Sequence, residues 1–178
     1  GFCLFGSVAV GAKRALDHHG LSRVAVVDFD VHHGNGTQDL LWDDARALFV
    51  TSQQMPLWPG TGHPYECGAH GQVVNLPLDP GSGGAAMRSA YAPALARIAG
   101  WKPDMILISA GFDAHADDPL AGLTWREDDF VWLTQRICDI ADAVCGGRVV
   151  SALEGGYDLA ALQASVAAHV GVLEERGR

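Results

Sequence analysis

Residues 23–39, RVAVVDFDVHHGNGTQD, interrupt an otherwise apolar strand with charged side chains. The segment begins as a β-branched, apolar run, which is typical of a strand buried on both faces of a sheet. Two acids, Asp28 and Asp30, then break that run, and His32 and His33 follow directly. A buried carboxylate is costly unless a positive charge lies against it. A bound metal ion therefore explains this segment best.

The alternative is a strand that ends in a polar loop, with Asp30 capping the turn and His32 solvated. The spacing favours the metal. Residues two apart on an extended chain share a face, so Asp28, Asp30 and His32 point the same way at the carboxyl end of the strand. Open α/β sheets bind their ligands at that end. The turn that follows leads into a short helix, for which we expect Asn35 or Thr37 as the N-cap.

Apolar runs alternate with segments of helical periodicity along the whole chain. Strands that alternate with helices predict a parallel sheet built from βαβ units. A length of 178 residues is enough for one domain with its own core. We therefore expect a single α/β domain over residues 1–178. The expected strands lie near residues 24–28, 47–51, 73–78, 105–109 and 148–153, and the expected helices near residues 4–19, 37–44, 83–100, 125–144 and 159–174.

The charge balance narrows the range of functions. The chain has 21 acids against 12 bases, which gives a formal net charge of -9. Nucleic-acid binding needs a basic surface, so direct binding to nucleic acid is not expected, whereas a cationic substrate or partner suits this chain. The four cysteines lack Cys-x-x-Cys spacing, which fits a reducing cytoplasm. No apolar run is long enough to span a membrane. The sequence does not determine the oligomeric state.

Unusual polar groups follow three of the expected strands. Asp30 and His32 follow the first, Asp113 another and Tyr157 a third. The carboxyl ends of parallel strands lie at one edge, so these side chains are able to converge. Two carboxylates and one imidazole form a three-ligand site with room for water, as in catalytic zinc sites, although Fe²⁺ suits the same ligands. The metal would polarise a substrate carbonyl and acidify its bound water.

Tyr157 lies on a loop with two glycines, where its phenol is able to donate to an oxyanion that develops during attack. The alternative is an aromatic side chain at the rim of the sheet, and the residue alone does not decide between the two.

Four motifs occur in order along the chain, namely DFDVHHGNGT at 28–37, SAGFDAH at 109–115, DPL at 118–120 and EGGY at 154–157. The segments GFC at 1–3 and WPGTG at 58–62 accompany them. Together they resemble the histone deacetylase and acetylpolyamine amidohydrolase family. The resemblance corresponds to the C-terminal half of a family member. It implies the three-layer, parallel-sheet arginase/deacetylase-like fold with its N-terminal part missing.

Position by position, the resemblance implies that Asp30, His32 and Asp113 bind zinc. It implies that Tyr157 is the donor to the transition state, with Gly155 supporting the ligands from the same loop. The expected activity is that of a zinc-dependent amidohydrolase, which removes acetyl or other acyl groups from lysine side chains or polyamines.

The resemblance also assigns residues around the zinc site. Phe2 and Trp58 would be walls of the acyl-lysine tunnel, with Trp58 standing where the family usually has Phe. Asp28 and Thr51, together with neighbouring backbone carbonyls, would form a structural potassium site, where the family usually has Ser in place of Thr51. His33 would stand beside the zinc ligands and point away from the metal.

One family motif has no counterpart in this sequence. Family members carry a Pro-Gly-His-His motif upstream of Gly-Phe-Cys, and its two histidines supply the general base and acid. His18 and His19 do not match it, because they follow Gly-Phe-Cys and lie on an expected helix. We therefore expect residues 1–178 by themselves to be inactive or nearly so.

Two other functions remain open. A non-catalytic protein that captures acetylated ligands would keep the pocket, although it would have no need of the Tyr157 phenol. A dinuclear manganese hydrolase of the arginase type would need more carboxylate ligands beside Asp28 and Asp30 than the sequence offers.

Overall fold

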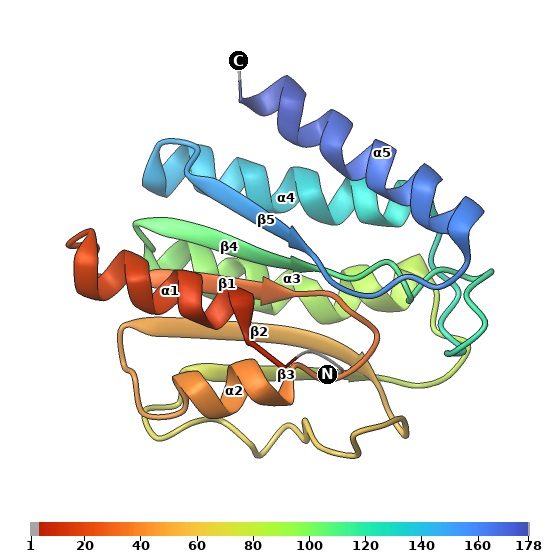
Figure 1. Ribbon diagram of the computed structural model, residues 1–178, viewed down its shortest axis with the longest axis horizontal. Helices are drawn as coiled ribbons and strands as arrows, with labels where there is room; N and C mark the ends of the chain where they lie inside the picture. The colour runs from red at the N-terminus through yellow and green to blue at the C-terminus, as the bar shows by residue number, and fades with distance from the viewer. Residues whose placement is uncertain (1–3, 178) are drawn as a thin grey trace.

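The computed structural model describes residues 4–177. Five parallel strands form one sheet in the order β3-β2-β1-β4-β5 (Figure 1). This confirms the predicted α/β class. In chain order the elements are α1 (Ser7–His18), β1 (Val24–Asp28), α2 (Asn35–Leu41), β2 (Ala47–Gln54), β3 (Val73–Leu78), α3 (Gly84–Trp101), β4 (Met105–Ala110), α4 (Glu127–Cys145), β5 (Val149–Leu153) and α5 (Leu159–Arg176).

Helices cover both faces of the sheet, which gives three layers. Val24 and Val26 of β1 pack with α1 on one face, whereas Ala25 and Val27 pack with α3 and α4 on the other. Figure 1 shows α1 and α2 in front of the sheet, α3 and α4 behind it, and α5 beside α4. Along β1, residues thus alternate between the two faces of the sheet, with the period of two expected of a strand buried on both faces. Among residues 4–177, no helix combines the length and apolarity needed to cross a membrane.

The strand register brings three loops to one edge of the sheet. Asp28, the last residue of β1, lies opposite Thr51 of β2 and Ser109 of β4. Ala110 of β4 lies opposite Leu153, the last residue of β5. Because these strands end level with one another, the chain segments that follow β1, β4 and β5 leave the sheet side by side.

Some local predictions differ from the structure: the helices expected near residues 4–19 and 37–44 span Ser7–His18 and Asn35–Leu41. The predicted N-cap of α2 is wrong, because the helix begins at Asn35 and Gly34 occupies the cap without a side-chain hydrogen bond. A Cβ at residue 34 would lie 2.4 Å from Asp28 Oδ2, so the turn needs glycine there. Strand β2 also continues beyond residue 51, because Ser52 and Gln54 pair with β3.

Candidate metal centre

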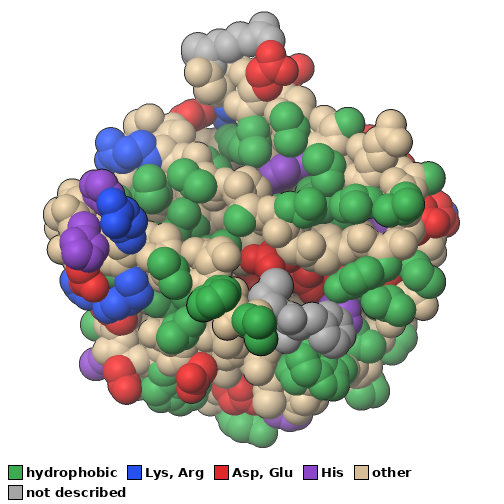
Figure 2. Space-filling view, viewed as in Figure 1, with side chains coloured by type: hydrophobic (Ala, Val, Ile, Leu, Met, Phe, Trp, Pro, Cys, Tyr) green, Lys and Arg blue, Asp and Glu red, His purple; other side chains and the backbone are tan. Residues whose placement is uncertain are grey.

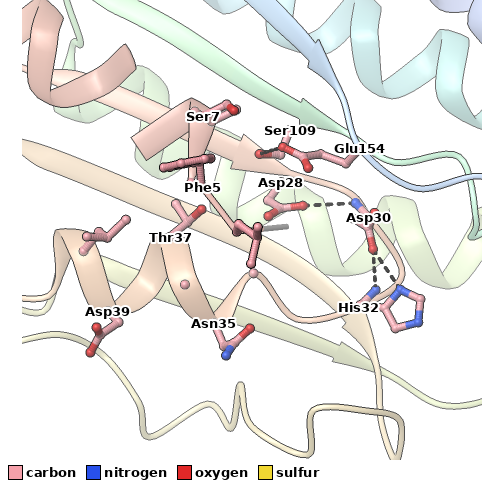
Figure 3. Close-up of a pocket in the computed structure, with 16 residues that line it drawn as sticks. Phe5, Ser7, Asp28, Asp30, His32, Asn35, Thr37, Asp39, Ser109 and Glu154 are labelled. Carbon is pink, nitrogen blue, oxygen red and sulfur yellow. Dashed lines mark hydrogen bonds and ion pairs between the residues drawn. The ribbon is translucent and has the colours of Figure 1, made fainter. Parts of the chain in front are cut away.

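The loop after β1 turns its polar residues away from the main core. Phe29 and Val31 are buried in the apolar cluster on the α3–α4 side. The Asp30 amide donates to Asp28 Oδ1 at 3.1 Å, and the His32 amide donates to Asp30 Oδ1 at 2.8 Å. Asp28, Asp30 and His32 therefore line a common cavity, as the alternation along the chain predicts (Figure 3).

Asp30, His32 and Asp113 come together at the carboxyl edge of the sheet. One ligand atom from each residue lies within 4.8 Å of the other two. His32 Nδ1 lies 3.1 Å from Asp30 Oδ1 and 3.0 Å from Asp113 Oδ2. All three side chains are buried, and Asp113 is fully so. Two of the three loops at this edge thus supply a compact set of two oxygens and one nitrogen.

Backbone amides and glycines hold the two carboxylates in place. The Val31 amide donates to Asp113 Oδ1 and the Gly155 amide donates to Asp30 Oδ2, each at 2.8 Å. A Cβ at Gly155 would lie 2.2 Å from Asp113 Oδ2, and one at Gly111 would lie 2.4 Å from Asp30 Oδ2.

The role of Gly111 was not predicted. The sequence placed it inside the SAGFDAH motif at 109–115 without assigning it a function. Only the contact with Asp30 reveals its role, because the two residues are far apart along the chain.

The charges at this site fit a cation. Burial raises the pKa of Asp113 to about 6, although His32 opposes that rise. Burial lowers the pKa of His32, but hydrogen bonds to Asp113 and Asp30 outweigh it and raise the pKa to about 9. Without a metal, a protonated imidazole therefore offsets one of the two carboxylate charges. A divalent cation would supply that positive charge directly, and two carboxylates with one imidazole are ligands that zinc accepts.

Next to the candidate ligands lies a cavity of about 290 Å³ whose lining includes four acids. Its acids are Asp28, Asp30, Asp39 and Glu154. Burial raises the pKa of Glu154, and the charge of Asp30 adds to the effect. Figure 2 shows acidic side chains gathered at the middle of this face, with apolar side chains around them. The cavity therefore favours cationic groups.

Asp28 and Thr51 lie on neighbouring strands in paired positions. Burial, followed by repulsion from Asp30, raises the pKa of Asp28 well above its usual range. Thr51 Oγ1 is buried without a hydrogen-bond partner among the described residues. A monovalent cation at this place would stabilise the buried carboxylate and would give the hydroxyl oxygen a partner.

Of the remaining predicted residues, the structure describes Trp58 and Tyr157. The Trp58 ring meets the His32 ring edge-on, with centroids 6.5 Å apart, and half of the Trp58 surface is exposed. Tyr157, on the loop after β5, is also partly exposed. Phe2 lies outside the described residues.

His33 points away from the candidate ligands, as the resemblance implies. Its Nδ1 lies 2.7 Å from Thr61 Oγ1 and its Nε2 lies 3.0 Å from Gln38 Oε1. Because a glutamine Oε1 accepts hydrogen bonds, His33 donates from Nε2 and its Nδ1 accepts from Thr61. His33 thus anchors the loop that carries Trp58.

Comparisons with known proteins agree with this geometry. Residues 1–173 match the histone deacetylase domain. The chain is 50% identical over 174 residues to "Histone deacetylase 10, chloroplastic" of Oryza sativa subsp. japonica, covering 94% of this chain and 39% of the rice protein. It is 39% identical over 165 residues to "Histone deacetylase-like amidohydrolase" of Pseudomonas aeruginosa, covering 88% of this chain and 43% of that protein. The chain thus spans less than half the length of these curated relatives.

A solved structure shares the fold. The crystal structure of the HDA15 HD domain superposes with a TM-score of 0.90 at 36% sequence identity, covering 97% of this chain and 50% of that one. The predicted arginase/deacetylase-like fold is therefore confirmed. The chain belongs to the histone deacetylase family.

Proposed function

We propose that this chain forms the metal-holding part of a zinc-dependent amidohydrolase that removes acyl groups from lysine side chains or polyamines. Membership of the histone deacetylase family supports hydrolysis of an amide. The observation that carries the proposal is the buried cluster of Asp30, His32 and Asp113 at the carboxyl edge of the sheet.

In this proposal Asp30, His32 and Asp113 hold the zinc ion, and Gly155 and Gly111 leave room for the carboxylates. Bound zinc acts as a Lewis acid that polarises the substrate carbonyl and lowers the pKa of a water ligand. Fe²⁺ would suit the same three ligands.

The chain's own side chains would orient the substrate and stabilise charge. The Tyr157 phenol donates a hydrogen bond to the oxyanion that forms on the carbonyl oxygen. Trp58, beside His32, and Phe2 would flank the acyl-lysine chain. Asp28 and Thr51 would hold a structural K⁺ ion, which would neutralise the buried Asp28 carboxylate.

We propose that residues 1–178 alone have little activity. The support for this proposal is that residues 1–178 lack the Pro-Gly-His-His motif of the family. His33 is held by Thr61 and Gln38, and His18 and His19 lie at the C-terminal end of α1. In this proposal, the imidazoles for proton transfer are those of the family's Pro-Gly-His-His motif. General acid-base catalysis is worth about 10²–10⁴-fold in rate.

The substrate is proposed from charge. The net charge of -9 and the four acids at the cavity favour a ligand with cationic groups beside its neutral acetyl-amide, such as a basic peptide that carries an acetylated lysine or an acetylpolyamine, over nucleic acid. The cytoplasmic location stays a prediction, and the name of the rice relative places that protein in the chloroplast.

The test combines metal analysis with hydrolysis of a fluorogenic acetyl-lysine amide by the complete protein. We expect one bound zinc ion per chain and hydrolysis that a chelator abolishes. Tyr157→Phe should lower kcat by about 10²–10³-fold, in line with the loss of one oxyanion donor. Binding of the acetylated ligand without any hydrolysis would instead identify a non-catalytic protein.

A further inference from the structure

Asp118 ties together two loops at the carboxyl edge of the sheet. Its side chain is buried, with 7% of the residue exposed. Asp118 Oδ1 accepts the amide proton of Leu120 at 2.9 Å, and Asp118 Oδ2 accepts that of Tyr157 at 2.8 Å. The first bond closes a local turn, for which one carboxylate oxygen is enough. The second bond crosses to the loop after β5, so the carboxylate does more than shape its own turn.

The loop after β5 is fixed first at Gly155. The Gly155 carbonyl accepts the amide proton of Phe112, and the Gly155 amide donates to Asp30 Oδ2, each at 2.8 Å. The next residue, Gly156, has a φ of 140°. Residues with a side chain rarely adopt this conformation, so the chain changes direction there. Anchoring Gly155 therefore does not by itself fix the direction in which the following residue leaves the loop.

On the other side of Tyr157, Asp158 belongs to the start of α5. The Asp158 side chain accepts the amide proton of Ala161 and caps the helix. Tyr157 thus stands between a glycine with unusual backbone freedom and the first turn of a helix. The Asp118 carboxylate accepts its amide proton at this point. A hydrogen bond to a buried carboxylate is charge-assisted and stronger than one between neutral groups.

We propose that Asp118 is a positioning residue that fixes the backbone of Tyr157 and thereby the placement of its phenol. This inference rests on the proposed function, in which that phenol donates to the oxyanion. Asp118 itself touches neither substrate nor metal in this proposal. Its effect on the reaction comes from keeping the donor where the negative charge develops, since a misplacement of about 1 Å at a reacting centre costs up to about 10²-fold in rate.

The informative variant is Asp118→Asn, measured in the complete protein. Asparagine keeps the size of the side chain but replaces one accepting oxygen with a donating NH₂ group, which then faces an amide N–H. We expect kcat for the fluorogenic acetyl-lysine amide to fall about tenfold to a hundredfold. KM and zinc content should stay at wild-type values, because the substrate and metal contacts are retained.

Asp117→Asn is the matched control. Asp117 is the sequence neighbour, but its carboxylate is exposed and pairs with Arg126 at the surface, 3.1 Å from Arg126 Nη1. This variant changes the same charge at nearly the same place without touching Tyr157. Its kcat should equal that of the wild type.

A double variant separates positioning from general destabilisation. If Asp118 acts through the phenol, Asp118→Asn combined with Tyr157→Phe should be no slower than Tyr157→Phe alone. Amide exchange over residues 154–158 should be faster in Asp118→Asn and unchanged in Asp117→Asn. Rate losses that multiply in the double variant would show a purely structural role and overturn the inference.

The two proposals fail in different ways. Full activity of Asp118→Asn beside a slow Tyr157→Phe would overturn the positioning role alone. Full activity of Tyr157→Phe would overturn the proposed role of the phenol, and with it the claim that Asp118 acts through it.

Discussion

At the candidate metal centre, the absence of a side chain at Gly155 matters as much as the carboxylate and imidazole groups themselves. Asp30 and Asp113 are buried side by side, and amides from Val31 and Gly155 hold one oxygen of each. Glycine at residue 155 leaves the space that both carboxylates occupy. The remaining oxygens are thereby directed toward His32 Nδ1.

Gly155→Ala should therefore weaken metal binding. The new Cβ would lie 2.2 Å from Asp113 Oδ2 and 2.6 Å from Asp30 Oδ2, so both proposed ligands must move. We expect zinc affinity to fall about 10–100-fold, as for other groups that orient metal ligands. Competition with a chromogenic chelator measures this. Gly36→Ala is the control, because nothing lies within 4 Å of a Cβ there, and equal zinc affinities in the two variants would contradict the prediction.

At the scale of elements, one buried histidine joins three of them. His169 of α5 lies 2.7 Å from Thr134 Oγ1 of α4 and 2.9 Å from Ser151 Oγ of β5. Thr134 donates its own proton to the Phe130 carbonyl, so His169 donates from Nδ1 and accepts from Ser151 at Nε2. The imidazole is thus held neutral within the packing of α5.

This arrangement predicts acid sensitivity. Burial lowers the pKa of His169 to about 4, below the usual 6.5. The unfolded chain therefore binds the proton first, and the stability contributed by the neutral imidazole is present above pH 6.5 and lost as the pH falls toward 4. The loss amounts to about 3 kcal/mol. Denaturant unfolding across this pH range should show a shallower pH dependence in His169→Gln than in the wild type. His18→Gln, which removes an exposed imidazole from α1, is the control for the loss of a histidine.

At the scale of the whole molecule, the proposed zinc ion would join segments that the sheet order makes neighbours. Asp30 and His32 follow β1, Asp113 follows β4, and these strands pair at the centre of the sheet. An ion that binds the folded chain and not the unfolded one stabilises the fold by mass action.

Zinc should therefore raise the thermal midpoint of the complete protein, and chelation should lower it. A free zinc concentration a hundred times Kd corresponds to about 2.7 kcal/mol. The affinity should rise with pH toward 9, because His32, whose pKa is raised to about 9, must lose its proton to bind. Thermal scans at several pH values measure both effects. Asp113→Asn should abolish the zinc-dependent shift, and an equal shift in that variant would rule out this site.

The sequence by itself determined the parts that depend on neighbours along the chain. Apolar runs marked the strands, and their alternation with helical segments predicted a parallel sheet. Because the carboxyl ends of parallel strands share one edge, the sequence also predicted that Asp30, His32 and Asp113 are able to converge.

Tertiary structure decided the contacts between residues far apart in sequence. The Gly155 amide meets Asp30 across 125 positions, and the Tyr157 amide meets Asp118 across 39. The extra length of β2 likewise depends on its pairing with β3. The sequence pattern predicts which face of a helix or strand is buried. Which loops contact each other depends on the strand order β3-β2-β1-β4-β5, which the pattern does not give. The cluster of Asp30, His32 and Asp113 was therefore predictable, and the family resemblance pointed to Gly155, whereas the contacts of Gly111 with Asp30 and of Asp118 with Tyr157 were not predicted.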